Sequence, residues 1–260
     1  MRTILFISTL MIGTLISVTY AQQTQPPVGI VEHLGQTVPM DEEFYDEHGN
    51  LVPLKSVITK PTVVTFVYFR CPGICSPLLS EVTKIVEKMD LELGKDYQIF
   101  TLSFDHNEKP DMAAEKRQNH LNEIKRKVDP NGWRFFTGDS ANIHRLTDAA
   151  GFYYQRNGRD WIHAAALIVL SPDGKITRYL YGIQHLPFDV KMAVIEASEG
   201  RATPTIAKIL QFCYAYDPEG RTYALNFTRI SGVIVVGFVG LFVLIFIIRP
   251  KKKTVKGTEE

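Results

Sequence analysis

A nearly continuous run of β-branched and aromatic residues occupies residues 61–69 (PTVVTFVYF). Such a run is typical of a strand that is buried on both faces of a mixed or parallel sheet. Apolar residues then recur at helical spacing over residues 78–89. This spacing predicts a helix with Ser76 as its N-cap and Pro77 as its first residue. The segment Cys71–Cys75 therefore lies at a strand-to-helix turn, where a helix N-terminus lowers the pKa of a thiol.

Strand and helix patterns continue to alternate on both sides of this unit. A turn at residues 46–50 divides residues 35–58 into the two arms of a β-hairpin, and Gly94 is expected to end the first helix. Further strands are predicted at residues 97–104, 133–136, 164–170 and 175–180, and helices at 110–128, 141–150, 187–199 and 203–212. The alternation predicts an α/β fold with a central mixed sheet flanked by helices, and the thiol-bearing loop after the first core strand is typical of a thioredoxin-like fold.

The two ends of the chain carry patterns of their own. Residues 1–21 have a charged start, an apolar core and a small-residue end, which predicts a secretory signal peptide, with an uncleaved anchor as the alternative. Residues 230–248 hold no charge and precede a cluster of Arg and Lys, which predicts a C-terminal transmembrane helix. The expected order is signal peptide 1–21, lead-in 22–34, folded domain 35–212, membrane-proximal segment 213–229, span 230–248 and cytoplasmic tail 249–260. The domain would then face outward from a single-pass inner-membrane protein.

Charge and cysteine content narrow the class of protein. The chain has 29 Lys and Arg against 28 Asp and Glu, and this balance argues against a nucleic-acid-binding protein. Its three cysteines are too few for a disulfide scaffold. Cys213 has two interpretations, an inert buried thiol or a membrane-proximal thiol for metal hand-over or intermolecular bridging.

The pair Cys71 and Cys75 forms a C-x3-C motif, one residue longer than the C-x-x-C redox signature. The spacing alone fits metal binding and redox exchange about equally, and fits a structural disulfide less well. A third metal-ligating residue close to the two thiols would favour metal binding over redox exchange. His163 is the histidine to consider, because it directly precedes the buried strand pattern at residues 164–170. A lone histidine in such a position is more often structural.

The segment TFVYFRCPGICSPLL, the stretch Ser103-Phe104-Asp105, and a histidine before a strand and a Ser-Pro-Asp-Gly turn together resemble the Sco/SenC family. These are thioredoxin-like copper proteins associated with cytochrome c oxidase assembly. The resemblance implies that Cys71, Cys75 and His163 are the copper ligands. His106 stands where the family usually has proline. This departure leaves open whether Asp105 orients the metal loop or docks a partner, and makes His106 a weak candidate for a role beside the site.

Donor chemistry agrees with this resemblance. Two thiolates and an imidazole suit Cu(I), with Cu(II) also accommodated, whereas zinc normally takes a fourth ligand. The expected function is copper delivery to the dinuclear centre of the oxidase. Its partners would be the copper-bearing oxidase subunit and another periplasmic copper donor. The alternative is a thiol-disulfide oxidoreductase in which His163 only tunes the thiols, and a peroxidase or a metal-free peptide-binding protein are more distant alternatives.

Overall fold

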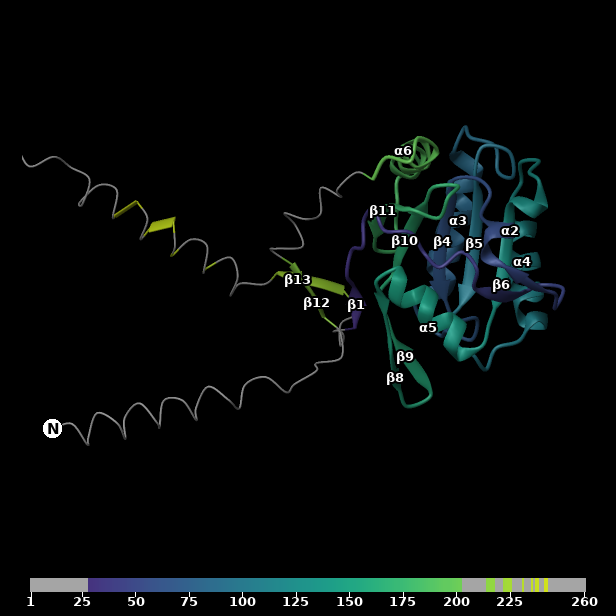
Figure 1. Cartoon of the computed structure of the whole chain (residues 1–260), viewed down its shortest axis with the longest axis horizontal. Coiled ribbons are helices and arrows are strands. Elements are labelled where there is room, and N and C mark those ends of the chain that lie inside the picture. Colours follow the sequence, from purple (N-terminus) through teal and green to yellow (C-terminus); the bar gives the residue numbers. More distant parts are fainter. Residues whose placement is uncertain are drawn as a thin grey trace, which may run out of the picture.

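The computed structural model describes residues 28–202, the strands β12 (Tyr214–Asp217) and β13 (Thr222–Leu225), and isolated positions between residues 231 and 242. A seven-stranded sheet with the order β11-β10-β4-β5-β6-β2-β3 forms the centre of the molecule (Figure 1). Its strands are β2 (Glu43–Asp46), β3 (Leu51–Pro53), β4 (Thr62–Val67), β5 (Gln98–Ser103), β6 (Trp133–Thr137), β10 (Ala166–Leu170) and β11 (Ile176–Tyr181). β4, β5 and β6 are parallel and the outer pairs are antiparallel, so the predicted mixed sheet is confirmed.

The strands β4 and β5 lie inside the sheet, with a hydrogen-bonded strand on either side of each, as the pattern of a buried strand predicts. Every residue of β4 and β5 is buried, and the parallel register pairs Val63 with Ile99 and Phe66 with Leu102. Both faces of these strands are covered, which explains why their apolar residues run continuously instead of alternating.

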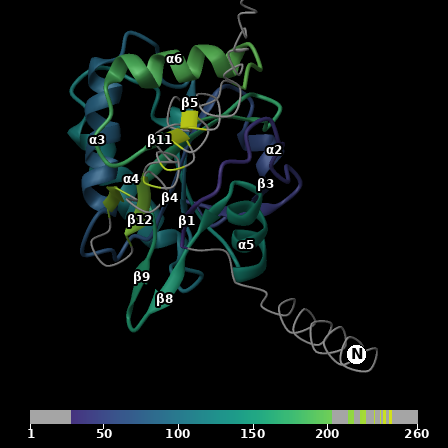
Figure 2. The same ribbon diagram turned by 90° about the vertical axis from the view of Figure 1, so that its left-hand side faces the viewer.

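Helices cover both faces of the sheet. α3 (Cys75–Lys88), α4 (Pro110–Glu123) and α6 (Pro187–Ser198) pack on one face, and α5 (Ser140–Ala149) lies on the other (Figure 2). The short helix α2 (Leu54–Val57) follows β3, and its Leu54 lines a small apolar cavity together with Leu146 of α5 and Val64 of β4.

The start of α3 and the ends of α3 and α4 differ from prediction. α3 already begins at Cys75, and Ile74 before it is helical and offers no side-chain cap, so the prediction of Ser76 as N-cap was wrong. α3 ends at Lys88, whereas Gly94 lies further on with φ +87° and packs closely against Asp129. α4 ends at Glu123, five residues before the predicted end at residue 128. The segment after α4 is held instead by the Glu87 carboxylate, which accepts from two of its backbone N–H groups, and leads to a 3-10 turn at Pro130–Gly132.

Four short strands have no counterpart in the prediction. β1 (Gly29–Ile30) pairs with β7 (Phe152–Tyr153), although it falls in the predicted lead-in. β8 (Gln155–Asn157) and β9 (Asp160–Ile162) form a hairpin that projects from the body of the domain (Figure 1). The sequence does carry a signal for this hairpin, since Asn157 at the end of β8 is followed by a two-residue turn, Gly158 and Arg159, in which Gly158 adopts φ +62°.

Several predicted segments lie outside the described residues: the signal peptide at 1–21, the helix at 203–212, Cys213, the tail at 249–260 and most of the span at 230–248. Within the part of the chain that the structure describes, no helix is both long and apolar enough to cross a membrane.

Candidate metal centre

The first half of the site is the loop that joins β4 to α3. Beyond Val67 the chain stays buried through Phe69 and then turns, with the Cys71 N–H donating to the Tyr68 carbonyl at 3.2 Å. The Gly73 N–H points at the Cys71 sulfur at 3.4 Å, and Cys75 is the first residue of α3. Both thiols are free, with 7% exposure at Cys71 and 2% at Cys75.

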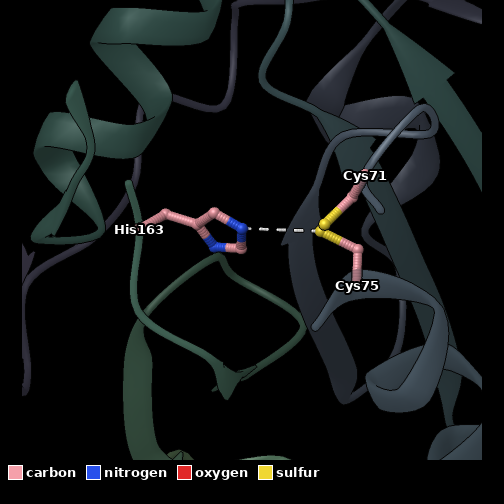
Figure 3. Close-up of side chains that lie close together, drawn as sticks. All are labelled: Cys71, Cys75 and His163. Atoms are coloured by element: carbon pink, nitrogen blue, oxygen red, sulfur yellow. Dashed lines mark hydrogen bonds between the residues drawn. The ribbon is translucent and has the colours of Figure 1, made fainter. Parts of the chain in front are cut away.

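The second half is His163, which lies between β9 and β10. Because β10 runs antiparallel to β4, the start of β10 lies beside the end of β4, and His163 reaches the dithiol loop from a separate segment (Figure 3). His163 is 3% exposed. Its Nδ1 lies 2.8 Å from the Ala164 carbonyl oxygen, and its Nε2 lies 3.5 Å from Cys75 Sγ. An Nδ1–H that donates to this carbonyl leaves the Nε2 lone pair facing the thiols.

The structure thus brings together the three residues singled out in the sequence. One ligand atom from each of Cys71, Cys75 and His163 lies within 4.8 Å of the other two. Within the described residues this is the one group of three or more Cys, His, Asp or Glu side chains arranged to hold a metal ion. His106, by contrast, is exposed and lies outside this group.

The two thiols have different proton affinities. Hydrogen bonding from the Cys75 thiol, together with His163 and the N–H groups of Cys75 and Gly73, outweighs burial and lowers the pKa of Cys71 to about 3. Burial and the adjacent Cys71 thiolate raise the pKa of Cys75 well above its usual value. The free site therefore holds one thiolate and one thiol, and a metal ion that takes both sulfurs displaces the Cys75 proton.

Aromatic rings surround the imidazole. The ring centroid of His163 lies 5.0 Å from that of Phe104, 5.8 Å from Tyr68 and 6.2 Å from Phe152. Burial, and to a smaller extent the hydrogen bond with the neighbouring Cys71 sulfur, raise the pKa of the Tyr68 phenol, which therefore stays neutral. These rings help to shield the imidazole from water, in keeping with the 3% exposure of His163.

Two carboxylates support the site without belonging to its donor set. Glu108 was not singled out from the sequence, yet it is buried and accepts the N–H groups of Phe69 and Arg70 just before Cys71. Asp105 accepts from the indole N–H of Trp161 at 3.2 Å. The sequence around Glu108 carries no signal for this role, because Phe69 and Arg70 lie 39 and 38 residues away in the chain.

Comparison with known proteins assigns this chain to a family. The family model for SCO1/SenC matches residues 34–194, well over half of the chain. The chain belongs to the SCO1/SenC family. Among curated proteins, the SCO1 protein homolog of Bacillus subtilis (strain 168) is 25% identical over 151 residues, which cover 56% of this chain and 75% of that protein.

Solved structures support the same fold. BsSco, described as a member of the Sco family of cytochrome c oxidase assembly proteins and as having a disulfide switch, is 23% identical with a TM-score of 0.52, covering 65% of this chain and 98% of that one. Arabidopsis thaliana ScoI with copper bound is 18% identical with a TM-score of 0.50, covering 64% and 98%. This SCO1/SenC chain therefore has the thioredoxin-like fold predicted for it.

Proposed function

We propose that this protein is a membrane-tethered, extracytoplasmic copper chaperone that delivers copper to the dinuclear centre of cytochrome c oxidase. The observation that carries the proposal is the convergence of Cys71, Cys75 and His163, whose ligand atoms all lie within 4.8 Å of one another. Two of these donors come from one loop and the third from the connection between β9 and β10, so a metal ion between them would be held by two separate parts of the chain.

Copper is the metal that this donor set favours. Two sulfurs and one imidazole nitrogen form a soft set of low coordination number, which suits Cu(I) and also accommodates Cu(II). A structural zinc site normally takes four protein ligands, and no fourth Cys, His, Asp or Glu joins the group within the described residues. Copper bound to a protein of the same fold, ScoI of Arabidopsis thaliana, supports this assignment.

The oxidase as the destination rests on family membership and on the description of BsSco as a cytochrome c oxidase assembly protein. The competing function is thiol-disulfide exchange with a cysteine pair of the oxidase. It is favoured by one observation, the lowered pKa of Cys71, because the thiolate is the attacking species in such exchange.

Copper binding is tested with the purified full-length chain, reconstituted anaerobically with Cu(I) and assayed by competition with a chromogenic chelator. We expect one copper per chain, and affinity losses of at least about 100-fold for Cys71→Ala, Cys75→Ala and His163→Ala, since each removes a donor that no neighbour replaces. His106→Ala is the matched control, an exposed histidine of the same region. Equal affinity in wild type and His163→Ala would reduce the site to a plain dithiol.

A second assay separates delivery from reduction. In cells, His163→Ala is expected to abolish assembly of the oxidase copper centre, while the purified variant still reduces a model disulfide through Cys71 and Cys75. Added copper should partly restore assembly, because the lost step is delivery at low metal. Normal assembly in His163→Ala, with failure of Cys71→Ser despite added copper, would identify a reductase.

Membrane tethering is a separate part of the proposal and rests on the uncharged residues 230–248 and the basic residues that follow. A tag after Glu260 should be cytoplasmic, and a tag in the turn at residues 47–50 should be cleaved by protease added to intact spheroplasts. Protection of the second tag would refute this topology.

A further inference from the structure

Two buried carboxylates on one short segment are hydrogen-bonded to the two parts of the chain that carry the candidate metal ligands. The segment runs from Ser103, the last residue of β5, to Glu108, and β5 pairs with β4 in the sheet. Glu108 is 1% exposed and Asp105 is 9% exposed, and neither belongs to the donor group. Burying a carboxylate is costly unless hydrogen bonds compensate for the lost water, so the partners of these two residues indicate what they do.

Glu108 is bonded to the dithiol loop. Its two carboxylate oxygens accept from the backbone N–H groups of Phe69 at 2.6 Å and Arg70 at 2.8 Å, and from the Ser103 hydroxyl at 2.6 Å. β4 has already ended at Val67, so these two N–H groups have no place in its sheet ladder. No Lys or Arg of residues 28–202 forms an ion pair with Glu108. The carboxylate thus replaces a missing strand partner and sets the course of the chain just before Cys71.

Asp105 is bonded to the segment that carries His163. One of its oxygens accepts from Asn107, through the backbone N–H at 3.0 Å and the side-chain amide at 2.8 Å. The other accepts from the Trp161 indole N–H at 3.2 Å, with the Arg156 guanidinium 4.0 Å away. That guanidinium also lies over the Trp161 ring, 4.8 Å from the ring atoms' centre. Trp161 is two residues before His163, so this contact fixes the end of the projecting hairpin from which His163 emerges.

We propose that the segment from Ser103 to Glu108 is a two-armed brace, in which Glu108 positions the Cys71–Cys75 loop and Asp105 positions His163. The two halves of the site come from parts of the chain that are far apart in sequence, and this segment is bonded to both. Neither carboxylate belongs to the donor group, so both are positioning residues. The proposal deepens the proposed function, because it rests on a site whose donors must be held at a set separation.

The brace predicts that the Cu(I) affinity changes caused by the Glu108 and Asp105 variants depend differently on His163. Glu108→Gln leaves one acceptor oxygen for three donors, and Asp105→Asn presents an amide N–H₂ toward Asn107 or Trp161. Each change is expected to lower Cu(I) affinity about 10- to 100-fold, the range typical of residues that orient metal ligands. In a His163→Ala background, Asp105→Asn should have no further effect, because it acts through the imidazole. Glu108→Gln should still weaken binding there, because it acts through the thiols.

Hydrogen exchange in the metal-free protein tests the brace independently of copper binding. Hydrogen exchange followed by NMR should become at least about tenfold faster at the Phe69 and Arg70 amides in Glu108→Gln, and at the Trp161 indole N–H in Asp105→Asn. Trp161→Phe, which keeps a ring and removes the donor, should reproduce the affinity loss of Asp105→Asn without adding to it. If Glu108→Gln does not fold, Ser103→Ala tests the same arm, since the Oε2 atom that accepts from Ser103 also accepts from Phe69.

Glu47→Gln is the matched control for a general loss of stability. Glu47 is a buried carboxylate paired with Arg134 and Arg117. Its replacement should lower the free energy of unfolding and leave copper affinity unchanged. Unchanged exchange rates in both brace variants, or an affinity loss in Glu47→Gln equal to theirs, would overturn the brace. Faster exchange in a protein that binds no copper would uphold the brace and refute the proposed function instead.

Discussion

Phe104 belongs to the hydrophobic core and also contacts the candidate metal centre through His163. It is 1% exposed, and its ring centroid lies within 6.0 Å of five other rings. Those rings belong to Tyr68, Phe152, Tyr154, Trp161 and His163. We predict that Phe104→Ala destabilises the domain and weakens copper binding at the same time.

The magnitude follows from burial and ring contacts. A fully buried Phe→Ala change costs about 3–5 kcal/mol, because the lost burial and the remaining cavity both contribute. Phe104→Leu fills more of the space and loses mainly the ring pairs, which contribute about 0.5–1.5 kcal/mol each where geometry is favourable. Since single domains unfold with about 5–15 kcal/mol, both variants should fold at low temperature. Without the Phe104 ring against it, the His163 imidazole is less firmly oriented, and this should lower the Cu(I) affinity by about tenfold.

Urea unfolding gives the first quantity and chelator competition the second. Phe136→Ala is the matched control, because Phe136 is also fully buried but stacks on Phe100 at 4.5 Å, away from the donor residues. It should cost about as much stability as Phe104→Ala and leave copper affinity unchanged. A loss below about 1 kcal/mol for Phe104→Ala, or equal copper affinities in the two variants, would refute the reasoning.

Three further predictions concern single groups. In the metal-free protein, thiolate absorbance should persist far below the usual Cys pKa of about 8.5, because the pKa of Cys71 is lowered to about 3. The free energy of unfolding that this ionisation contributes is complete above the pKa of Cys71 in the unfolded state, and it is lost as the pH falls toward the lower pKa of the folded state. The stability difference between wild type and Cys71→Ser should therefore shrink as the pH is lowered, and a difference that stays constant would contradict the lowered pKa. Thr101→Val should cost about 2–4 kcal/mol in urea unfolding, because it strips the Trp133 indole and the Thr65 hydroxyl of their partner, whereas Thr65→Val should cost clearly less. Cys213→Ala should leave copper affinity unchanged in chelator competition.

The central strand and the helix after it were predictable from local pattern alone. The apolar run ending near Cys71 and the helical spacing beginning near Cys75 depend only on neighbouring residues, so the two thiols could be placed at a strand-to-helix turn. Among the described residues, the other strands of the central sheet and the helices α4, α5 and α6 followed in the same way with errors at their ends, whereas the short strands β1, β7, β8 and β9 were missed. Those ends depend on contacts from elsewhere, as the Glu87 carboxylate beyond α4 illustrates.

Only the tertiary structure decided how the site closes. His163 could be selected from sequence through a family resemblance, but its position opposite Cys75 results from the antiparallel pairing of β10 with β4. Nothing local to Glu108 indicates that its oxygens accept the N–H groups of Phe69 and Arg70, 39 and 38 residues away in the chain. Periodicity reports which face of an element is buried, whereas the pairing and register of distant strands determine which side chains meet.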